Sequence, residues 1–305
     1  MDGYASASSA MELHGIKTTV YTTCPSLILC DTELMRLAPA EMISAGFGDM
    51  AAKLISVADW KIAHIITGEY YCEEIAAMMR RAYSAVLASA NGLKERDEGA
   101  VRSMTKGLIL SGLAMSFAGV SRPASGMEHT FSHLLEMFAL ARGAQPASHG
   151  LQVGCGVREA LRLYERAYIF EPSAEKCRRV SEAFDESAWE RGMRSVFGAQ
   201  ADTLIEKARE ERRNAPEKIF ARGMAAVEHW EDIRAVIAEV LAEKSSLEAA
   251  LDMLDIPSIA SIGELGYTPY EAQNALTYSK DLRARYIFTS MCADIGLTET
   301  IPYFV

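Results

Sequence analysis

The chain has 305 residues, of which 50 % are hydrophobic and 24 % charged, the balance of a soluble globular protein. Its formal net charge of -10 argues against nucleic acid or an anionic membrane as the main partner, because phosphate groups bind to positive surfaces. The six cysteines form no C-x-x-C pair, which favours reduced thiols and a cytoplasmic protein.

Residues 1–45 differ in pattern from the rest of the chain. Two short runs of β-branched or apolar residues, KTTVYTT at 17–23 and SLILCD at 26–31, predict two strands separated by Cys24 and Pro25. The periodicity changes to that of helices after Pro39.

The remainder of the chain predicts a mainly α fold. Long apolar segments with helical periodicity lie at 46–62, 69–91, 97–119, 124–142 and 150–169. The helical pattern continues through 173–255, with prolines as breaks, and shorter helices follow at 258–295. The longest apolar stretch, residues 107–120, is too short to span a bilayer and is predicted to be a buried helix.

Three histidines on or near one predicted helix are candidate residues for a metal site. His129 and His133 are four residues apart and share a helix face, and His149 follows a break at 143–146. Asp49 lies upstream in a G-F-G-D segment, where we expect the positive end of a beginning helix to keep its carboxylate ionised. Imidazoles with one carboxylate suit a catalytic divalent metal, because three protein ligands leave a position for water or substrate.

Several motifs spread along the chain point to one family. They are DGYASASSAM at 2–11, SAGFGDMAAKLISVADW at 44–60, SGLAMSFAGVSRPASGMEHTFSH at 111–133, HGLQVG at 149–154, ELGYTPYEAQNAL at 264–276 and LRARYIF at 282–288. Together they resemble the sn-glycerol-1-phosphate dehydrogenases, relatives of glycerol dehydrogenase, 3-dehydroquinate synthase and the iron-containing alcohol dehydrogenases. The string S-R-P-A-S-G-x-E-H-x-x-S-H is the most specific of these motifs.

The resemblance implies the C-terminal helical-bundle domain of a dehydroquinate synthase-like enzyme, with a short β remnant at its N-terminus. Family members carry a nucleotide-binding domain before the DG-x-AS segment, and no G-x-G-x-x-G follows a strand in this chain. We therefore expect residues 1–45 to be the remnant of that α/β domain and residues 46–305 to form the α-helical metal-binding catalytic domain. We also expect the chain alone to hold NAD(P) poorly.

The resemblance implies that Asp49, His129 and His149 bind the metal, with zinc expected first and nickel or iron as alternatives. His133 matches a position near the site and is expected to act catalytically, in proton transfer or substrate contact. Glu128 immediately precedes His129 and so points to another side of the helix, which excludes the H-E-x-x-H pattern of zinc proteases.

Four further residues are implied in substrate or cofactor binding. Lys53 stands where iron-dependent alcohol dehydrogenases have a fourth metal ligand, and this cation points to an anionic substrate. Lys53 and Arg122 are therefore candidates for binding the substrate phosphate, although either could form a structural ion pair. Asp2 is expected to bind a substrate hydroxyl in the catalytic site, and Ser6 to bind the cofactor.

The implied reaction is the NADH- or NADPH-linked reduction of dihydroxyacetone phosphate to sn-glycerol 1-phosphate, a backbone for phospholipids. We expect a small phosphorylated substrate, a homo-oligomer, and neither a nucleic-acid nor a membrane partner. Two alternatives stay open. A glycerol or other polyol dehydrogenase of the same superfamily would make Lys53 and Arg122 structural, and a catalytically silent metal-binding module would retain the site without the reaction.

Overall fold

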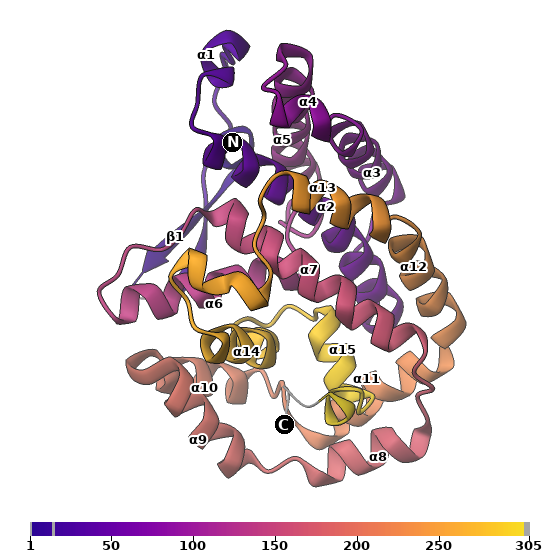
Figure 1. Ribbon diagram of the computed structural model, residues 1–305. Coiled ribbons are helices and arrows are strands. Elements are labelled where there is room, and N and C mark those ends of the chain that lie inside the picture. The colour runs from indigo at the N-terminus through magenta and orange to yellow at the C-terminus, as the bar shows by residue number, and fades with distance from the viewer. Residues whose placement is uncertain (1, 14–15, 302–305) are drawn as a thin grey trace.

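The computed structural model describes residues 2–13 and 16–301, and in this part of the chain helices dominate, so the predicted mainly α fold is confirmed (Figure 1). The β structure of the described residues is one antiparallel pair, β1 (Ser8–Leu13) with β2 (Ile16–Tyr21). The register pairs Ser8 with Tyr21 and Leu13 with Ile16. A short 3-10 helix, η1 (Asp2–Ala5), precedes the pair and packs against α5 (Glu98–Ala118).

The two predicted strands have different outcomes. The run at 17–23 corresponds to β2, whereas the prediction for 26–31 is wrong, because residues 22–31 have no regular structure. A strand forms only with a partner for its backbone groups, and the partner of β2 is instead β1. The β1 sequence SSAMEL has no β-branched residue, so its strand could not be recognised from composition.

The helical body follows from residue 32 onward. Its first helices are α1 (Thr32–Arg36), α2 (Ala40–Thr67), α3 (Glu73–Leu87), α4 (Ala90–Lys94), α5, α6 (Met127–Ala141) and α7 (His149–Tyr168). The later ones are α8 (Ala174–Ala183), α9 (Glu186–Phe197), α10 (Ala201–Glu210), α11 (Pro216–Glu228), α12 (Trp230–Ala242), α13 (Lys244–Met253), α14 (Pro269–Tyr278) and α15 (Phe288–Asp294). The predicted helical segments therefore match α2, α3, α5, α6 and α7 closely. The predicted domain boundary after residue 45 falls inside α2.

Helix α2 is the centre of the packing, with α6 and α7 against it. The closest approach of α2 and α7 is made by two glycines, Gly48 and Gly150. A Cβ atom on Gly150 would lie 1.8 Å from the carbonyl oxygen of Ala45, and one on Gly48 would lie 2.1 Å from the carbonyl oxygen of Gly150. Only glycine permits this separation of the two backbones.

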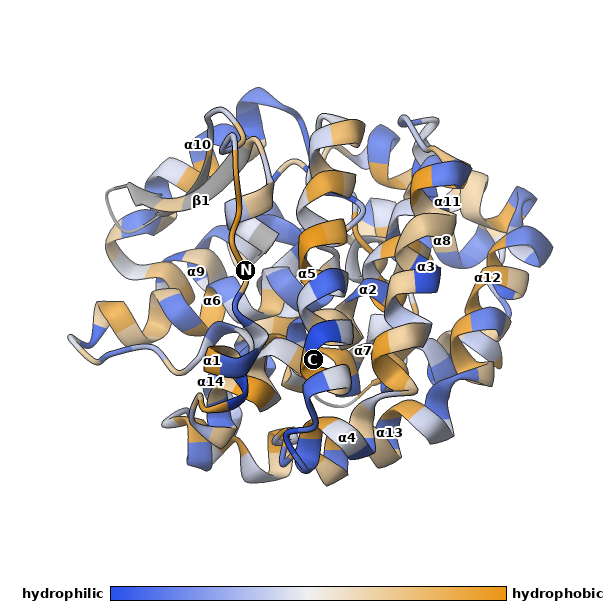
Figure 2. Ribbon diagram, turned by 90° about the horizontal axis from the view of Figure 1, so that it is seen from above, coloured by the Kyte–Doolittle hydropathy of each residue, from blue (hydrophilic) through white to orange (hydrophobic). Residues whose placement is uncertain are grey.

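The outer helices bury one face each. Figure 2 shows hydrophilic and hydrophobic residues alternating around helices such as α12 and α13, the pattern of helices that lie on the surface of a core. Across the described residues we find no helix with both the length and the apolar character needed to cross a bilayer.

Candidate metal centre

Three helices bring the predicted ligands together. Asp49 comes from α2, His129 from the first turn of α6, and His149 is the first residue of α7. One ligand atom of each lies within 4.8 Å of the other two. The rings of His129 and His149 meet edge to face, with their centroids 5.4 Å apart. Residues that are far apart in the sequence thus form one cluster of potential metal ligands.

Asp49 lies in the interior of α2, and the expectation that it stands at the start of a helix is wrong. The G-F-G segment continues the helix that begins at Ala40, because its glycines serve close packing rather than a break. Burial by itself opposes ionisation of Asp49, but the Lys53 ammonium 3.2 Å away and the hydrogen bond with His129 hold the pKa of this carboxyl well below its usual range. Asp49 is therefore an anion at neutral pH.

His129 lies between two carboxylates. Its Nε2 is 3.2 Å from Asp49 Oδ1, and its Nδ1 is 2.8 Å from Glu128 Oε1. Burial would lower the pKa of His129, but the bonds to Asp49 and Glu128 outweigh it and raise this pKa. One nitrogen thus faces the ligand cluster and the other faces the protein.

A second set of potential ligands shares His149 with the first. It consists of His133, Glu136 and His149, again with one ligand atom of each within 4.8 Å of the others. His149 Nδ1 lies 3.0 Å from Glu136 Oε1, and His133 Nδ1 lies 3.6 Å from Glu136 Oε2. Burial lowers the pKa of His133 to about 3, so this imidazole is neutral near pH 7.

The donor set of Asp49, His129 and His149 fits a divalent metal. It combines one anionic oxygen with two imidazoles, as catalytic sites for zinc and related metals do. The side chain of His149 is 42 % exposed, whereas those of Asp49 and His129 are nearly buried, so the cluster opens to solvent on the His149 side. Three protein ligands and one open side leave room for a substrate oxygen.

Lys53, a candidate for the substrate phosphate, lies beside the cluster. It is fully buried, and its Nζ donates to Asp49 Oδ1 and, at 3.1 Å, to the carbonyl oxygen of Ala124. The structure therefore places its charge next to a predicted metal ligand.

Arg122, the other candidate, belongs to a buried network behind α6. It donates to Glu69 Oε2 at 2.6 Å and to the carbonyl oxygen of Tyr286 at 2.7 Å, and it lies 3.5 Å from Asp59 Oδ1. Burial raises the pKa of Asp59 to about 7 despite the charge of Arg122. These contacts favour a structural ion pair for Arg122.

The structure gives less information on Ser6 and Asp2, the two predicted site residues near the N-terminus. Ser6 is buried, and the next residue, Ala7, donates its backbone N–H to Ser116 Oγ of α5 at 3.0 Å. The loop therefore lies on α5. Asp2 falls in η1, but its side chain is outside the described part of the structure.

Three residues near the cluster were missed by the sequence analysis. Glu136 could have been found, since it lies seven residues after His129 and therefore on the same face of α6. For Glu128 it is the role that was missed: the sequence analysis expected this residue to point to another side of the helix, but its Oε1 lies 2.8 Å from His129 Nδ1. Arg283, in the LRARYIF motif, is close enough that its charge lowers the pKa of His133 and interacts with Glu136.

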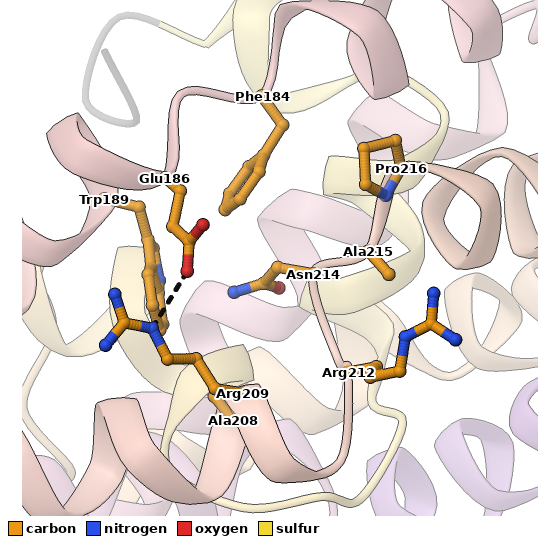
Figure 3. A pocket seen from close by; sticks show the side chains of 9 residues that line it. All are labelled: Phe184, Glu186, Trp189, Ala208, Arg209, Arg212, Asn214, Ala215 and Pro216. Atoms are coloured by element: carbon orange, nitrogen blue, oxygen red, sulfur yellow. Dashed lines mark hydrogen bonds and ion pairs between the residues drawn. The ribbon is translucent and has the colours of Figure 1, made fainter.

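A separate pocket of about 290 Å³ lies among α8 to α11 (Figure 3). Phe184 and Trp189 form one side of it, and Arg209 and Arg212 contribute cations. Arg209 Nε is 2.9 Å from Glu186 Oε1, so this cation is already paired. The pocket contains none of the predicted site residues.

Comparison with known proteins supports the family resemblance that was inferred from the motifs. The chain is 36 % identical over 211 residues to the glycerol-1-phosphate dehydrogenase (NAD(P)+) of Thermococcus sibiricus, covering 69 % of this chain and 58 % of that protein. It is 41 % identical over 155 residues to the enzymes of that name from Bacillus licheniformis and Pyrococcus furiosus, covering 51 % of this chain and 39 % and 44 % of those proteins. The chain thus spans less than two thirds of these relatives. No family model matches it. The predicted resemblance to glycerol-1-phosphate dehydrogenases is confirmed.

Proposed function

We propose, starting from the resemblance to the glycerol-1-phosphate dehydrogenases, that this chain carries the metal-binding part of an enzyme that reduces dihydroxyacetone phosphate to sn-glycerol 1-phosphate with NADH or NADPH. The observation that carries the proposal is the convergence of Asp49, His129 and His149 from three helices. These are the residues that the motifs imply as metal ligands. A divalent metal held there would act as a Lewis acid on the substrate carbonyl, and the nicotinamide would supply the hydride.

The residues around the cluster have separate roles in this proposal. Asp49, His129 and His149 hold the metal, and Lys53 balances the charge of Asp49 at 3.2 Å. His133 faces His149 with ring centroids 5.7 Å apart. Because its pKa is lowered to about 3, His133 is a neutral hydrogen-bonding group near pH 7. This favours substrate contact, with water delivering the proton.

The substrate phosphate needs a cation within reach of the cluster. Lys53 and Arg122 were the candidates, but both have carboxylate partners in the protein. Arg283 has its charge close to His133 and Glu136, so we add it to the candidates. Asp2 and Ser6 are proposed to contact the substrate hydroxyl and the cofactor, as the resemblance implies.

The remaining properties are also proposals. Zinc is the first choice of metal, because two imidazoles and a carboxylate match its usual ligands, with nickel and iron as alternatives. We propose a homo-oligomer in the cytoplasm that acts in phospholipid synthesis, with no nucleic-acid or membrane partner.

The test of the metal centre is elemental analysis of the purified chain beside the variant Asp49→Ala/His129→Ala/His149→Ala. About one equivalent of zinc, nickel or iron is expected in the chain, and none in the variant. His229→Ala is the matched control, because this exposed histidine pairs with Asp232 and lies outside both ligand groups. No metal in the parent chain, even after reloading, would contradict the proposal.

Because the chain alone is expected to hold NAD(P) poorly and could be inactive by itself, the reaction is tested with an enzyme reconstituted to include a nucleotide-binding domain. Oxidation of NADH or NADPH with dihydroxyacetone phosphate is compared with oxidation of glycerol by NAD+ or NADP+. Turnover restricted to the phosphorylated substrate is expected. Turnover of glycerol alone would favour a polyol dehydrogenase, and bound metal without either reaction would favour a silent metal-binding module.

A further inference from the structure

Both histidines of the ligand cluster have a glutamate carboxylate as partner on Nδ1. His129 Nδ1 lies 2.8 Å from Glu128 Oε1, and His149 Nδ1 lies 3.0 Å from Glu136 Oε1. Both glutamates belong to α6, although His149 itself comes from α7. One helix therefore supplies a carboxylate to each imidazole.

A carboxylate on Nδ1 determines which nitrogen is available for a metal. A neutral imidazole carries one N–H, and a carboxylate accepting from Nδ1–H leaves the lone pair on Nε2. In His129 this nitrogen is the one that lies 3.2 Å from Asp49 Oδ1, so it faces another of the proposed metal ligands. The same bond fixes the orientation of the ring and makes the imidazole a stronger donor to the metal.

Glu128 is held in place by more than His129. It is fully buried, and its Oε1 also accepts from the backbone N–H of Gly126 at 2.9 Å, at the start of α6. A Cβ on Gly126 would lie 2.8 Å from Glu128 Oε2, so the glycine leaves the space that the carboxylate occupies. A carboxylate fixed in this way has little freedom to leave the imidazole.

Glu136 serves two histidines from one carboxylate. Its Oε1 accepts from His149 Nδ1, while its Oε2 lies 3.6 Å from Nδ1 of His133. Ser132 Oγ, 3.2 Å from His149 Nδ1, is a second polar group at the same nitrogen. His149 is the most exposed of the proposed ligands and is the one most in need of orientation from a buried neighbour.

We infer that Glu128 and Glu136 are positioning residues of the metal centre: each accepts a hydrogen bond from Nδ1 of one histidine ligand, Glu128 from His129 and Glu136 from His149, and so directs Nε2 to the metal. This inference rests on the proposed function, because it assumes that the two histidines bind a metal. In this inference α6 orients His149, the ligand on α7, as well as its own ligand, His129.

The test measures the zinc dissociation constant of the chain by competition with a chromophoric chelator. Glu128→Ala and Glu136→Ala are each expected to weaken zinc binding by about 10- to 100-fold, the usual effect of removing such a partner. Glu128→Gln and Glu136→Gln should recover part of this loss, since the amide oxygen still accepts from Nδ1–H. The control is Glu159→Ala, which removes a buried glutamate paired with Arg162.

The melting temperature of each variant without metal separates positioning from general instability. Weaker zinc binding in a glutamine variant that melts at the parent temperature supports the inference. Parent-like affinity in both alanine variants would overturn it and leave the metal centre intact. Complete loss of zinc in Glu136→Gln with parent-like affinity in Glu128→Ala would also overturn it, and would place the metal among His133, Glu136 and His149. A parent chain without affinity for zinc, nickel or iron would overturn the proposed function and this inference together.

Discussion

Helix α6 and the segment that leads into α2, residues 21–42, have opposite surroundings. Every residue from 126 to 137 is buried, including His129 and His133, whereas no residue from 21 to 42 is buried. Leu27 and Leu29 are 82 % and 88 % exposed, and Leu34 and Leu37 of the same segment are also exposed. The side chains of the first region are packed inside the protein, whereas those of the second region are all at least partly exposed to water.

The two regions differ in how far their side chains are buried, and this difference has functional consequences. In α6, burial fixes the polar groups of the candidate metal centre, because each buried histidine needs a partner within the protein. In residues 21–42, apolar side chains remain in contact with water, as is typical of a surface that another protein surface covers. We therefore expect mutations in the two regions to have very different effects.

The largest effect is expected from Gly150→Ala in the packed region. The new Cβ would lie 1.8 Å from the carbonyl oxygen of Ala45, so α7 would have to move away from α2. We expect the free energy of unfolding to fall by about 3 kcal/mol, the upper range for overpacking. Urea denaturation followed by circular dichroism measures this change.

The matched control is Gly263→Ala, because nothing lies within 4 Å of a Cβ at Gly263 and its φ is not positive. It should change the free energy of unfolding by less than about 0.5 kcal/mol. An equal loss of stability in both variants would mean that the close approach of α2 and α7 is not the cause.

The next effect concerns Asp59, whose pKa is raised to about 7 by burial. In the unfolded chain this carboxyl has a pKa of about 3.9, so between these values the folded state binds more protons than the unfolded state. The stability that this group contributes is complete below about pH 4 and is lost as the pH rises through 7. Asp59→Asn should remove a slope of at most about 1.4 kcal/mol per pH unit from the free energy of unfolding.

The measurement is urea unfolding of the metal-free chain and of the variant between about pH 5 and 8. Asp252→Asn, which changes an exposed carboxylate, should leave the slope as it is. Identical slopes in the parent chain and in Asp59→Asn would show that Asp59 is ionised throughout this range.

The smallest effect on stability is expected in the exposed region. Leu29→Ser/Leu34→Ser should change the free energy of unfolding by less than about 0.5 kcal/mol, because both side chains are largely in water. It should nevertheless weaken self-association in sedimentation velocity. Leu135→Ala, at a fully buried position of α6, is the contrasting variant and should cost about 3 kcal/mol. Unchanged association would argue against this surface as the contact between copies.

The sequence predicted what depends on local periodicity. The helices matching α2, α3, α5, α6 and α7 could be predicted because their apolar residues recur with the helical period. The shared face of His129 and His133 followed from the same period. The strand at 26–31 was wrong because its apolar residues suggested a strand, whereas strand formation depends on a pairing partner elsewhere.

The parts that failed depend on contacts between distant residues. Asp59, for example, accepts from the backbone N–H of Phe288, 229 residues away, and Arg122 donates to Tyr286, 164 residues away. Such pairs leave no periodic pattern in a single sequence. Asp49 was placed at a helix start because glycines usually interrupt helices, but here they permit close packing inside one.

The glycine contact between α2 and α7 also limits how this site could be transferred to another protein. Gly48 immediately precedes Asp49, and Gly150 immediately follows His149, so the separation of the two backbones sets the distance between these side chains. A design that copied only Asp49, His129 and His149 onto three helices, with the helices of Asp49 and His149 at an ordinary spacing of about 8–10 Å, would hold these donors too far apart. The smallest portable unit is therefore the three ligands together with the two glycines.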